Sequence, residues 1–215
     1  MPLTDSTLLV RLFNWWHGAR TRRSGPGHRL VSDNARLRGT FIEFEGRDGR
    51  VELGRDVRLF DCTITVRGAA PRLVIGAGTR LRNVRIVVED EGSRLLIGPS
   101  TSMTGALLQA KEGGLVQIGT DCMVGGGVEV NNSDSHSLLD AATGARLNPA
   151  RDVIIGDHVW LGSGVWISKG VRIGAGTVVA ARSRVSGELP PAVLAAGSPA
   201  TVKRTGVTWD RRRLP

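Results

Sequence analysis

A short polar segment, NNSDSHSLLD over residues 131–140, carries the side chains best suited to acid–base chemistry. His136 lies there close to Asp134 and Asp140. A neutral imidazole can accept a proton from an alcohol near pH 7, and a neighbouring carboxylate can fix its tautomer. His136 is therefore a candidate general base, with Asp134 or Asp140 as its orienting carboxylate. These residues alone leave open whether His136 has a chemical role or is an idle loop histidine.

The remaining histidines and the cysteines have more ordinary explanations. His17 and His28 belong to an N-terminal arm, and His158 falls on an outward corner, where a structural role is expected. Cys62 and Cys122 are too few for a disulfide framework. Cys122 occupies a small inward position four residues after Ile118, so we expect it in the core.

A six-residue repeat must position this segment. Between residues 153 and 186, a branched aliphatic residue followed by a small residue recurs at every sixth position: Ile155, Leu161, Ile167, Ile173, Val179 and Val185. A period of six fits neither an α-helix nor an ordinary strand. It fits short strands separated by tight corners, three to each 18-residue coil. Trp160 and Trp166, each five residues after a core aliphatic, should face outward and require a cover, either another subunit or a ligand.

Longer coils are expected before this region. Aliphatic–glycine steps at Leu53, Ile75, Ile97 and Ile118 are separated by 22, 22 and 21 residues. The next step, from Ile118 to Ile155, is 37 residues long. We therefore expect the polar segment 131–150 to leave the coil as an excursion, and long loops in compact repeat proteins are usually functional. The sequence predicts an all-β parallel β-helix with coils of 18–22 residues.

Both ends of the chain differ from the repeats. Residues 7–16 place Leu8, Leu9, Leu12, Trp15 and Trp16 on one helical face, with Arg11, Asn14 and His17 pointing away. That face could pack on a β-helix, its own or a neighbour's, or lie on an anionic membrane. We expect an N-terminal helix and basic arm over 1–29, with 20–29 as a loop, the β-helix over 30–189, and a C-terminal cap and basic tail over 190–215. Residues 193–204 should be extended and the last eleven residues frayed.

Charge is concentrated at the ends. The net charge is +9, but residues 1–30 and 201–215 each hold five arginines or lysines against one aspartate, which leaves the body nearly neutral. This distribution favours contact of the ends with an anionic surface or ligand and argues against a nucleic-acid groove across the domain. No secretory signal is visible, and the longest uncharged run is shorter than the roughly 20 apolar residues of a membrane span. We expect a cytoplasmic protein, with peripheral membrane contact through residues 7–29 left open.

Residues 131–149, followed by VIIGDHVWLGSGVWISKGVRIGAGTVV, resemble the hexapeptide-repeat acyltransferases, in particular the bacterial O-acetyltransferases of capsule, exopolysaccharide and lipopolysaccharide. The resemblance covers residues 120–204. It implies a left-handed parallel β-helix, a homotrimer with sites between subunits, and direct acetyl transfer from acetyl-CoA to a sugar hydroxyl with no metal. In this family the loop histidine is the general base, which selects His136.

The resemblance also implies binding residues. Trp160 should line the site, whereas Trp166 has no counterpart. The pantetheine arm of acetyl-CoA should contact the region of Gly162, Ser163 and Ala181, and its nucleotide end Ser186, Lys203 and Arg204. We place Asn131 and Asn132 at the acceptor sugar. Two departures from the family pattern are Thr201, where a basic residue is usual, and Ala180-Ala181-Arg182, where Gly-Ala-Gly is usual.

Three other functions are compatible with this pattern. The same base could serve an N-acetyltransferase acting on an amino sugar or nucleotide sugar. A non-catalytic scaffold at the membrane would use the basic ends and Trp15-Trp16. A carbonic anhydrase of this fold would need three histidine ligands for zinc, but the body offers only His136 and His158.

Overall fold

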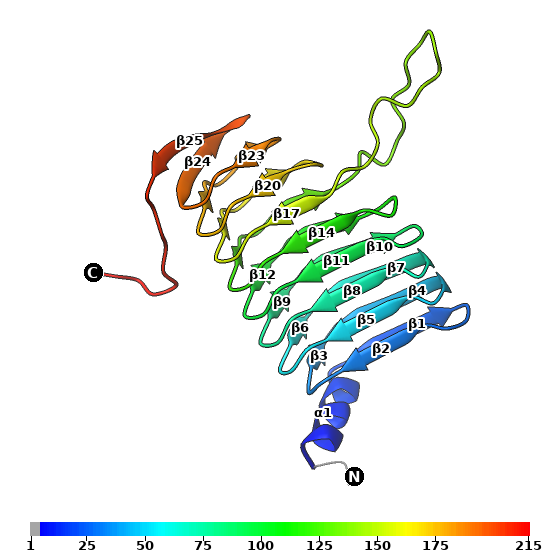
Figure 1. The fold of residues 1–215 in the computed structure, drawn as a ribbon. Coiled ribbons are helices and arrows are strands. Elements are labelled where there is room, and N and C mark those ends of the chain that lie inside the picture. The colour runs from blue at the N-terminus through cyan, green and yellow to red at the C-terminus, as the bar shows by residue number, and fades with distance from the viewer. Residues whose placement is uncertain (1–4) are drawn as a thin grey trace.

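The chain folds into a three-sided parallel β-solenoid preceded by one helix (Figure 1). The structure is a computed structural model that describes residues 5–215, with side chains described from Leu9 onward. The predicted all-β class is confirmed. Each turn of the solenoid contributes one strand to each of three sheets, here called A, B and C in the order in which the chain visits them.

The three sheets run along the whole solenoid. Sheet A contains β1 (Arg20–Ser24), β4 (Phe41–Arg47), β7 (Thr63–Ala69), β10 (Arg85–Glu89), β13 (Leu107–Ala110), β16 (Glu129–Asn131), β19 (Trp166–Ile167) and β22 (Arg184–Val185). Sheet B contains β2 (Arg29–Ser32), β5 (Arg50–Leu53), β8 (Arg72–Ile75), β11 (Arg94–Ile97), β14 (Leu115–Ile118), β17 (Val153–Ile155), β20 (Arg172–Ile173) and β23 (Glu188–Leu189). Sheet C contains β3 (Arg36–Arg38), β6 (Arg58–Phe60), β9 (Arg80–Arg82), β12 (Ser102–Thr104), β15 (Met123–Val124), β18 (Trp160–Leu161), β21 (Val178–Val179), β24 (Val193–Gly197) and β25 (Ala200–Thr205).

The core is a set of aliphatic columns, one inside each sheet. Strands alternate between buried and outward residues, as in Arg72–Ile75, where Leu73 and Ile75 are buried. Parallel register stacks Leu53, Ile75, Ile97, Ile118, Ile155 and Ile173 directly above one another. The predicted steps of 22, 22 and 21 residues are thus confirmed. An excursion does leave the coil, but Asn131 still belongs to strand β16, so it begins at residue 132 and ends before Val153.

Corners between strands require the left-handed backbone conformation. At the corner from sheet C to sheet A, the positive φ angles belong to Gly39, Asp61, Asn83, Gly105, Gly127, Gly164 and Arg182. Glycine, asparagine and aspartate tolerate this conformation best, which explains the residue types at six of these seven corner positions. Arg182 is the exception, with a φ of 61° where the preceding coil has Gly164. Gly162 has a different constraint, because an added Cβ would lie 2.6 Å from the Ala181 nitrogen.

The N-terminal helix forms as predicted, but the face that carries Asn14, and not the face that carries Trp15 and Trp16, contacts the solenoid. Helix α1 (Asp5–Trp16) packs against β3 through Asn14, whose amide donates to the Ala35 carbonyl (3.0 Å) and accepts from the Leu37 nitrogen (2.8 Å). The expectation that Asn14 points away is wrong, because it satisfies backbone groups at the open end of the solenoid. Trp15 and Trp16 remain exposed. The predicted loop over 20–29 is also wrong in part, since Arg20–Ser24 is strand β1.

The C-terminal end is a cap, as predicted, but its tail is ordered. Strand β25 pairs antiparallel with β24 and ends the stacking of sheet C. The expectation of eleven frayed residues is wrong, because the tail folds back over sheet C (Figure 1) and buries Trp209 to 8% exposure. The Trp209 ring stacks on His158 at 4.2 Å, and its indole nitrogen donates to the His158 carbonyl (2.7 Å). The expected structural role of His158 is therefore confirmed.

Candidate active site

The polar excursion leaves the solenoid at the corner between sheets A and B. It connects β16 to β17 and projects beyond the coils, the green-yellow hairpin in Figure 1. An isolated bridge between Leu139 and Arg146 closes its tip. A projecting segment of this length needs attachments at its base to hold a side chain in place, and the structure provides three.

Buried Asn132 is the first attachment. Its side chain accepts from the Lys111 nitrogen (2.8 Å) and donates to the Lys111 carbonyl (2.9 Å), which ties the loop base to the preceding coil. Asn132 is completely buried. The expectation that it contacts substrate is therefore wrong, since its amide is used by backbone groups in the interior.

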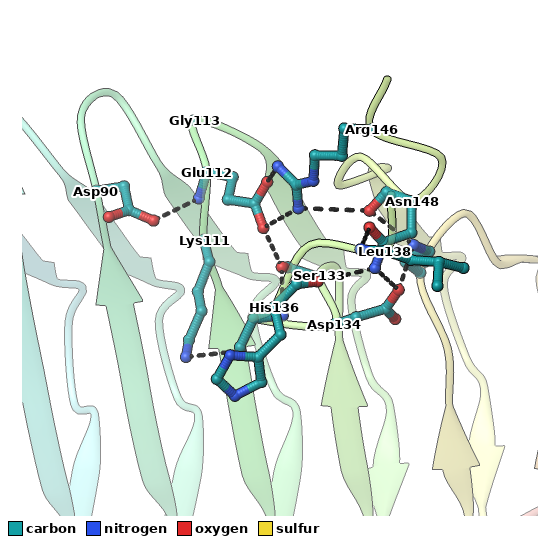
Figure 2. Close-up of polar contacts among 12 residues, drawn as sticks. Asp90, Lys111, Glu112, Gly113, Ser133, Asp134, His136, Leu138, Arg146 and Asn148 are labelled. Atoms are coloured by element: carbon teal, nitrogen blue, oxygen red, sulfur yellow. Dashed lines mark hydrogen bonds and ion pairs between the residues drawn. The ribbon is translucent and has the colours of Figure 1, made fainter. Parts of the chain in front are cut away.

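Glu112 is the second attachment. Arg146 donates to both oxygens of this carboxylate (2.6 and 3.0 Å), and the Ser133 hydroxyl donates to it as well (Figure 2). The Arg146 hydrogen bonds, together with that from Ser133, lower the pKa of Glu112 to about 2. A two-pronged charged contact of this kind is geometrically specific. It fixes the returning arm of the loop to the corner of the preceding coil.

Asn148 and Asp134 form the third attachment. The Asn148 amide donates to Asp134 (2.8 Å) and to the His136 carbonyl (2.8 Å), and accepts from the Leu138 nitrogen (2.6 Å). Lys169, from the following coil, donates to Asp134 at 2.5 Å, and this contact lowers the pKa of Asp134. Both arms of the loop are thereby joined around the backbone of His136.

The His136 imidazole itself is exposed, and neither expected carboxylate contacts it. Figure 2 shows the ring and the Asp134 carboxylate on different sides of the loop. Asp140 lies at the tip, where it accepts from Ala142 and Thr143 and closes its own turn. The expected pairing of His136 with Asp134 or Asp140 is absent from the chain, because both carboxylates are engaged in holding the loop. His136 is positioned through its backbone instead.

A hollow of about 430 Å³ lies beside the loop on the outer surface of sheet A. Asn131 and Asp134 line it together with Trp166, Lys169 and Arg184. Asn131, which we expected at the acceptor sugar, is thus one of the residues that line this hollow. Trp166, for which the family resemblance gave no role, was missed. Its register opposite Glu129 places it in sheet A, on the coil next to the one from which the loop departs.

A second hollow, of about 440 Å³, lies on sheet C. Trp160 and Arg204 line it with Val178, Leu194 and Trp209. The structure therefore brings together two of the residues expected at acetyl-CoA. Gly162 and Ser163 follow β18 at the corner between sheets C and A, and Ala181 stacks on them. Lys203 is exposed outside this hollow, and Ser186 lies at the corner between sheets A and B, so neither joins it.

The C-terminal tail holds one wall of the sheet C hollow. Arg211 donates to Asp121 (3.0 Å) and to the Ser102 hydroxyl (2.7 Å), and His158 Nδ1 lies 2.8 Å from Asp121. Partial burial opposes ionisation of Asp121, but the hydrogen bonds with His158 and Arg211 lower its pKa nevertheless. The sequence placed these residues in separate regions, and only the return of the tail brings them together.

Comparison with known proteins gives a consistent result. The chain is 48% identical over 50 residues to a polysialic acid O-acetyltransferase of Neisseria meningitidis, which is 23% of each chain. It is 36% identical over 96 residues to that of Escherichia coli O1:K1 / APEC, which is 45% of this chain and 31% of the relative. The crystal structure of the polysialic acid-specific acetyltransferase NeuO superposes with a TM-score of 0.86 and 29% identity over 90% of this chain and 89% of NeuO. The chain is thus similar in sequence and in fold to polysialic acid O-acetyltransferases.

A further structure extends this relationship. The polysialic acid O-acetyltransferase OatWY gives a TM-score of 0.74 at 28% identity, over 91% of this chain and 93% of that protein. No protein-family model matches the chain. The matched segments span only 23% and 31% of the curated relatives. The predicted relationship to the hexapeptide-repeat sugar O-acetyltransferases is confirmed.

Two features are absent from residues 5–215. No helix among them is long and apolar enough to cross a bilayer. No group of three or more histidine, cysteine, aspartate or glutamate side chains in this range is arranged to hold a metal ion.

Proposed function

We propose that the protein transfers an acetyl group from acetyl-CoA to a hydroxyl of an anionic capsule polysaccharide, with His136 as general base. The observation that carries this proposal is the loop geometry. The imidazole is exposed on a backbone held from both arms of the loop. The residues just before it, Asp134 and Ser135, line a polar hollow that has Trp166 as an aromatic wall, although His136 itself does not line it. The names of the homologues supply the acceptor class, because both curated relatives are called polysialic acid O-acetyltransferases.

The transfer requires one proton acceptor and no covalent enzyme intermediate. His136 takes the proton of the sugar hydroxyl as that oxygen attacks the thioester carbonyl. The carbon–sulfur bond then breaks, and the proton passes from the imidazolium to the departing CoA thiolate. An acetyl-cysteine intermediate is disfavoured because Cys62 and Cys122 are buried, and burial raises the pKa of the Cys122 thiol to about 11.

The sheet C hollow suits the donor. Trp160, Val178 and Leu194 give it an apolar floor for the pantetheine arm, and Arg204 gives it a cation for the phosphates. The Gly162 amide already donates to the Val179 carbonyl (2.8 Å), so the backbone amide of Ser163 is the proposed donor to the developing oxyanion. Lys203 and Ser186 remain proposals for the nucleotide end.

The two hollows lie on different sheets of one chain, so we further propose that adjacent copies complete the site. In a closed trimer, the sheet A hollow and His136 of one copy would face the sheet C hollow of the next. This arrangement would also cover Trp160 and Trp166, which are 38% and 36% exposed in the single chain. An N-acetyltransferase would use the same base, but both curated relatives are named O-acetyltransferases, which favours a hydroxyl acceptor.

The test is transfer of acetyl groups to polysialic acid, followed by release of free thiol. His136→Ala should lower kcat by about 10²–10⁴-fold, with acetyl-CoA binding by calorimetry unchanged. His136→Gln serves as the control for side-chain volume and should be equally impaired. Full activity in His136→Ala would exclude this base, and no acetyl-CoA binding to the wild type would exclude the transferase.

The exposed face of α1 is a second surface to be covered. Leu9, Leu12, Trp15 and Trp16 are all at least half exposed. We propose that a neighbouring copy or an anionic membrane covers this face, in a protein that uses acetyl-CoA in the cytoplasm. Cosedimentation with anionic vesicles, compared between wild type and Trp15→Ala/Trp16→Ala, distinguishes the two covers.

A further inference from the structure

Outward arginines are stacked on the N-terminal half of sheet C. Parallel register places Arg36, Arg58 and Arg80 directly above one another on β3, β6 and β9. The next outward column reads Arg38, Phe60 and Arg82. These five arginines, with Phe60 among them, are called the arginine face below. The net charge of the body is nearly neutral and does not reveal this local cluster of positive charge.

Four of the five arginines of the arginine face have no carboxylate partner among the described residues. Among the residues that the structure describes, its only ion pair joins Arg38 to Asp61 at 3.8 Å. Sheet B provides the contrast, since Glu52 binds both Arg50 (3.0 Å) and Arg72 (2.8 Å) of its arginine column. On sheet A, Arg67 lies between Glu45 and Glu89. Arg50, Arg72 and Arg67 are therefore neutralised by neighbouring glutamates. Of the arginine face, only Arg38 has such a partner among the described residues.

An unneutralised stack costs stability. Neighbouring strands are about 4.8 Å apart, and like charges directly opposite each other in a sheet repel. Binding of an external anion would supply the negative charges that this stack of arginines lacks and would relieve the repulsion. Because the guanidinium groups repeat at the strand spacing, that anion should carry charges at several points along its length, as a polymer does.

The surface is also shaped to receive a ligand. A hollow of about 300 Å³ is lined by Arg58, Arg80 and Arg82 around Phe60, and no acidic residue lines it. The Arg38 and Arg82 guanidinium groups lie 5.0 and 5.9 Å from the Phe60 ring centre. Guanidinium groups match carboxylates in a two-pronged geometry, and an aromatic ring offers an apolar surface to a sugar ring.

We infer that the arginine face binds carboxylates of an anionic polysaccharide at sugars remote from the one that is acetylated. The inference rests on the proposed function and adds a second site to it. The column that contains Arg80 continues through Ser102 and Met123 to Trp160. Three strand spacings separate Arg80 from Trp160, a distance of about 14 Å. A polymer lying along sheet C can therefore reach from the arginine face to the proposed donor hollow.

The experiment compares two pairs of substitutions. Arg58→Gln/Arg80→Gln removes two charges from the arginine face. Arg29→Gln/Arg94→Gln is the matched control, because both arginines are exposed at the equivalent strand position on sheet B and neither has an ion pair among the described residues. Binding of long polysialic acid is measured by calorimetry, with neutral dextran as the uncharged polymer. KM is measured for long polysialic acid, for a sialic acid trimer and for acetyl-CoA.

The inference predicts about a tenfold loss of affinity for long polysialic acid, and a matching rise in its KM, only in Arg58→Gln/Arg80→Gln. KM for the trimer and for acetyl-CoA should change less than twofold. Unchanged polymer affinity, or equal loss with the trimer, would overturn the inference. So would a change of mass by light scattering, since the arginine face would then be a subunit contact. Polymer binding is measured without turnover, so a failure of the acetyl-transfer proposal remains distinguishable.

Discussion

At the scale of single residues, His136 depends on the backbone around it. Asn148 contacts the His136 carbonyl, the Leu138 nitrogen and Asp134 with a single side chain. Among the side chains that the structure describes, no carboxylate is hydrogen-bonded to the imidazole ring. The loop therefore fixes the position of the His136 ring. The tautomer of the ring must be set by groups of the bound substrate or of another copy of the chain.

Asn148→Ala should consequently lower activity without unfolding the protein. Loss of three contacts lets the His136 backbone shift, and a displacement of about 1 Å at a catalytic group can cost roughly 100-fold in rate. We expect kcat to fall by about 10–100-fold, with an unchanged melting temperature. Asp140→Ala is the control, since Asp140 supports only the turn at the tip. Equal activity of Asn148→Ala and wild type would show that the loop does not need this clamp.

At the scale of the element, the loop is attached through an ionised Glu112. Its folded pKa is about 2, against an ordinary value of 4.5. A carboxyl whose pKa is lowered on folding stabilises the folded form above its unfolded pKa, and this contribution is lost as pH falls toward the folded value. The attachment should be intact above about pH 4.5 and weaken progressively toward pH 2.

Hydrogen exchange of amides 138–147 measures this attachment. In the wild type, protection should decrease between pH 4.5 and pH 2 after correction for intrinsic exchange. Glu112→Gln should already show the reduced protection at pH 7, with the solenoid amides unaffected. Identical protection in Glu112→Gln and wild type at pH 7 would mean that the Arg146 ion pair does not hold the loop.

Much of the solenoid could be predicted because its signal is local. Every coil repeats the same inward aliphatic and the same small corner residue, so the period is visible without knowing any contact. Strand β1 was not predicted because it belongs to the first coil, which has no further coil beside it, and because all five residues of the strand are exposed. The orientation of α1 escaped because Asn14, rather than the apolar residues, meets the open backbone of the solenoid.

The site was predictable in its parts and not in its assembly. His136 stood out by residue type and by the irregular spacing of its loop. Trp160 and Trp166 are six residues apart, so they fall on different sheets of a three-sided coil. The six-residue period alone therefore predicts that they line separate surfaces. The return of Trp209 and Arg211 to sheet C is a long-range contact that no local pattern encodes.

At the scale of the whole molecule, the separation of the two hollows makes shared sites testable. His136→Ala and Trp160→Ala chains should each be inactive alone. Mixed and reassembled one to one, they should recover about a quarter of wild-type activity, because one interface in four then pairs an intact His136 with an intact Trp160 in a closed trimer. A mixture prepared without exchange of subunits is the control. No recovery after exchange would place the whole site within one chain.

The constant register of the 22-residue coils has a consequence for how such a protein can change. Arg36, Arg58 and Arg80 occupy equivalent positions, so duplication or deletion of one whole coil would preserve every strand pairing on either side. Each added coil would lengthen the solenoid by about 4.8 Å and bring one more arginine. The chain length of the polymer that is held could thus be altered by gene duplication, while the loop and its chemistry stay untouched.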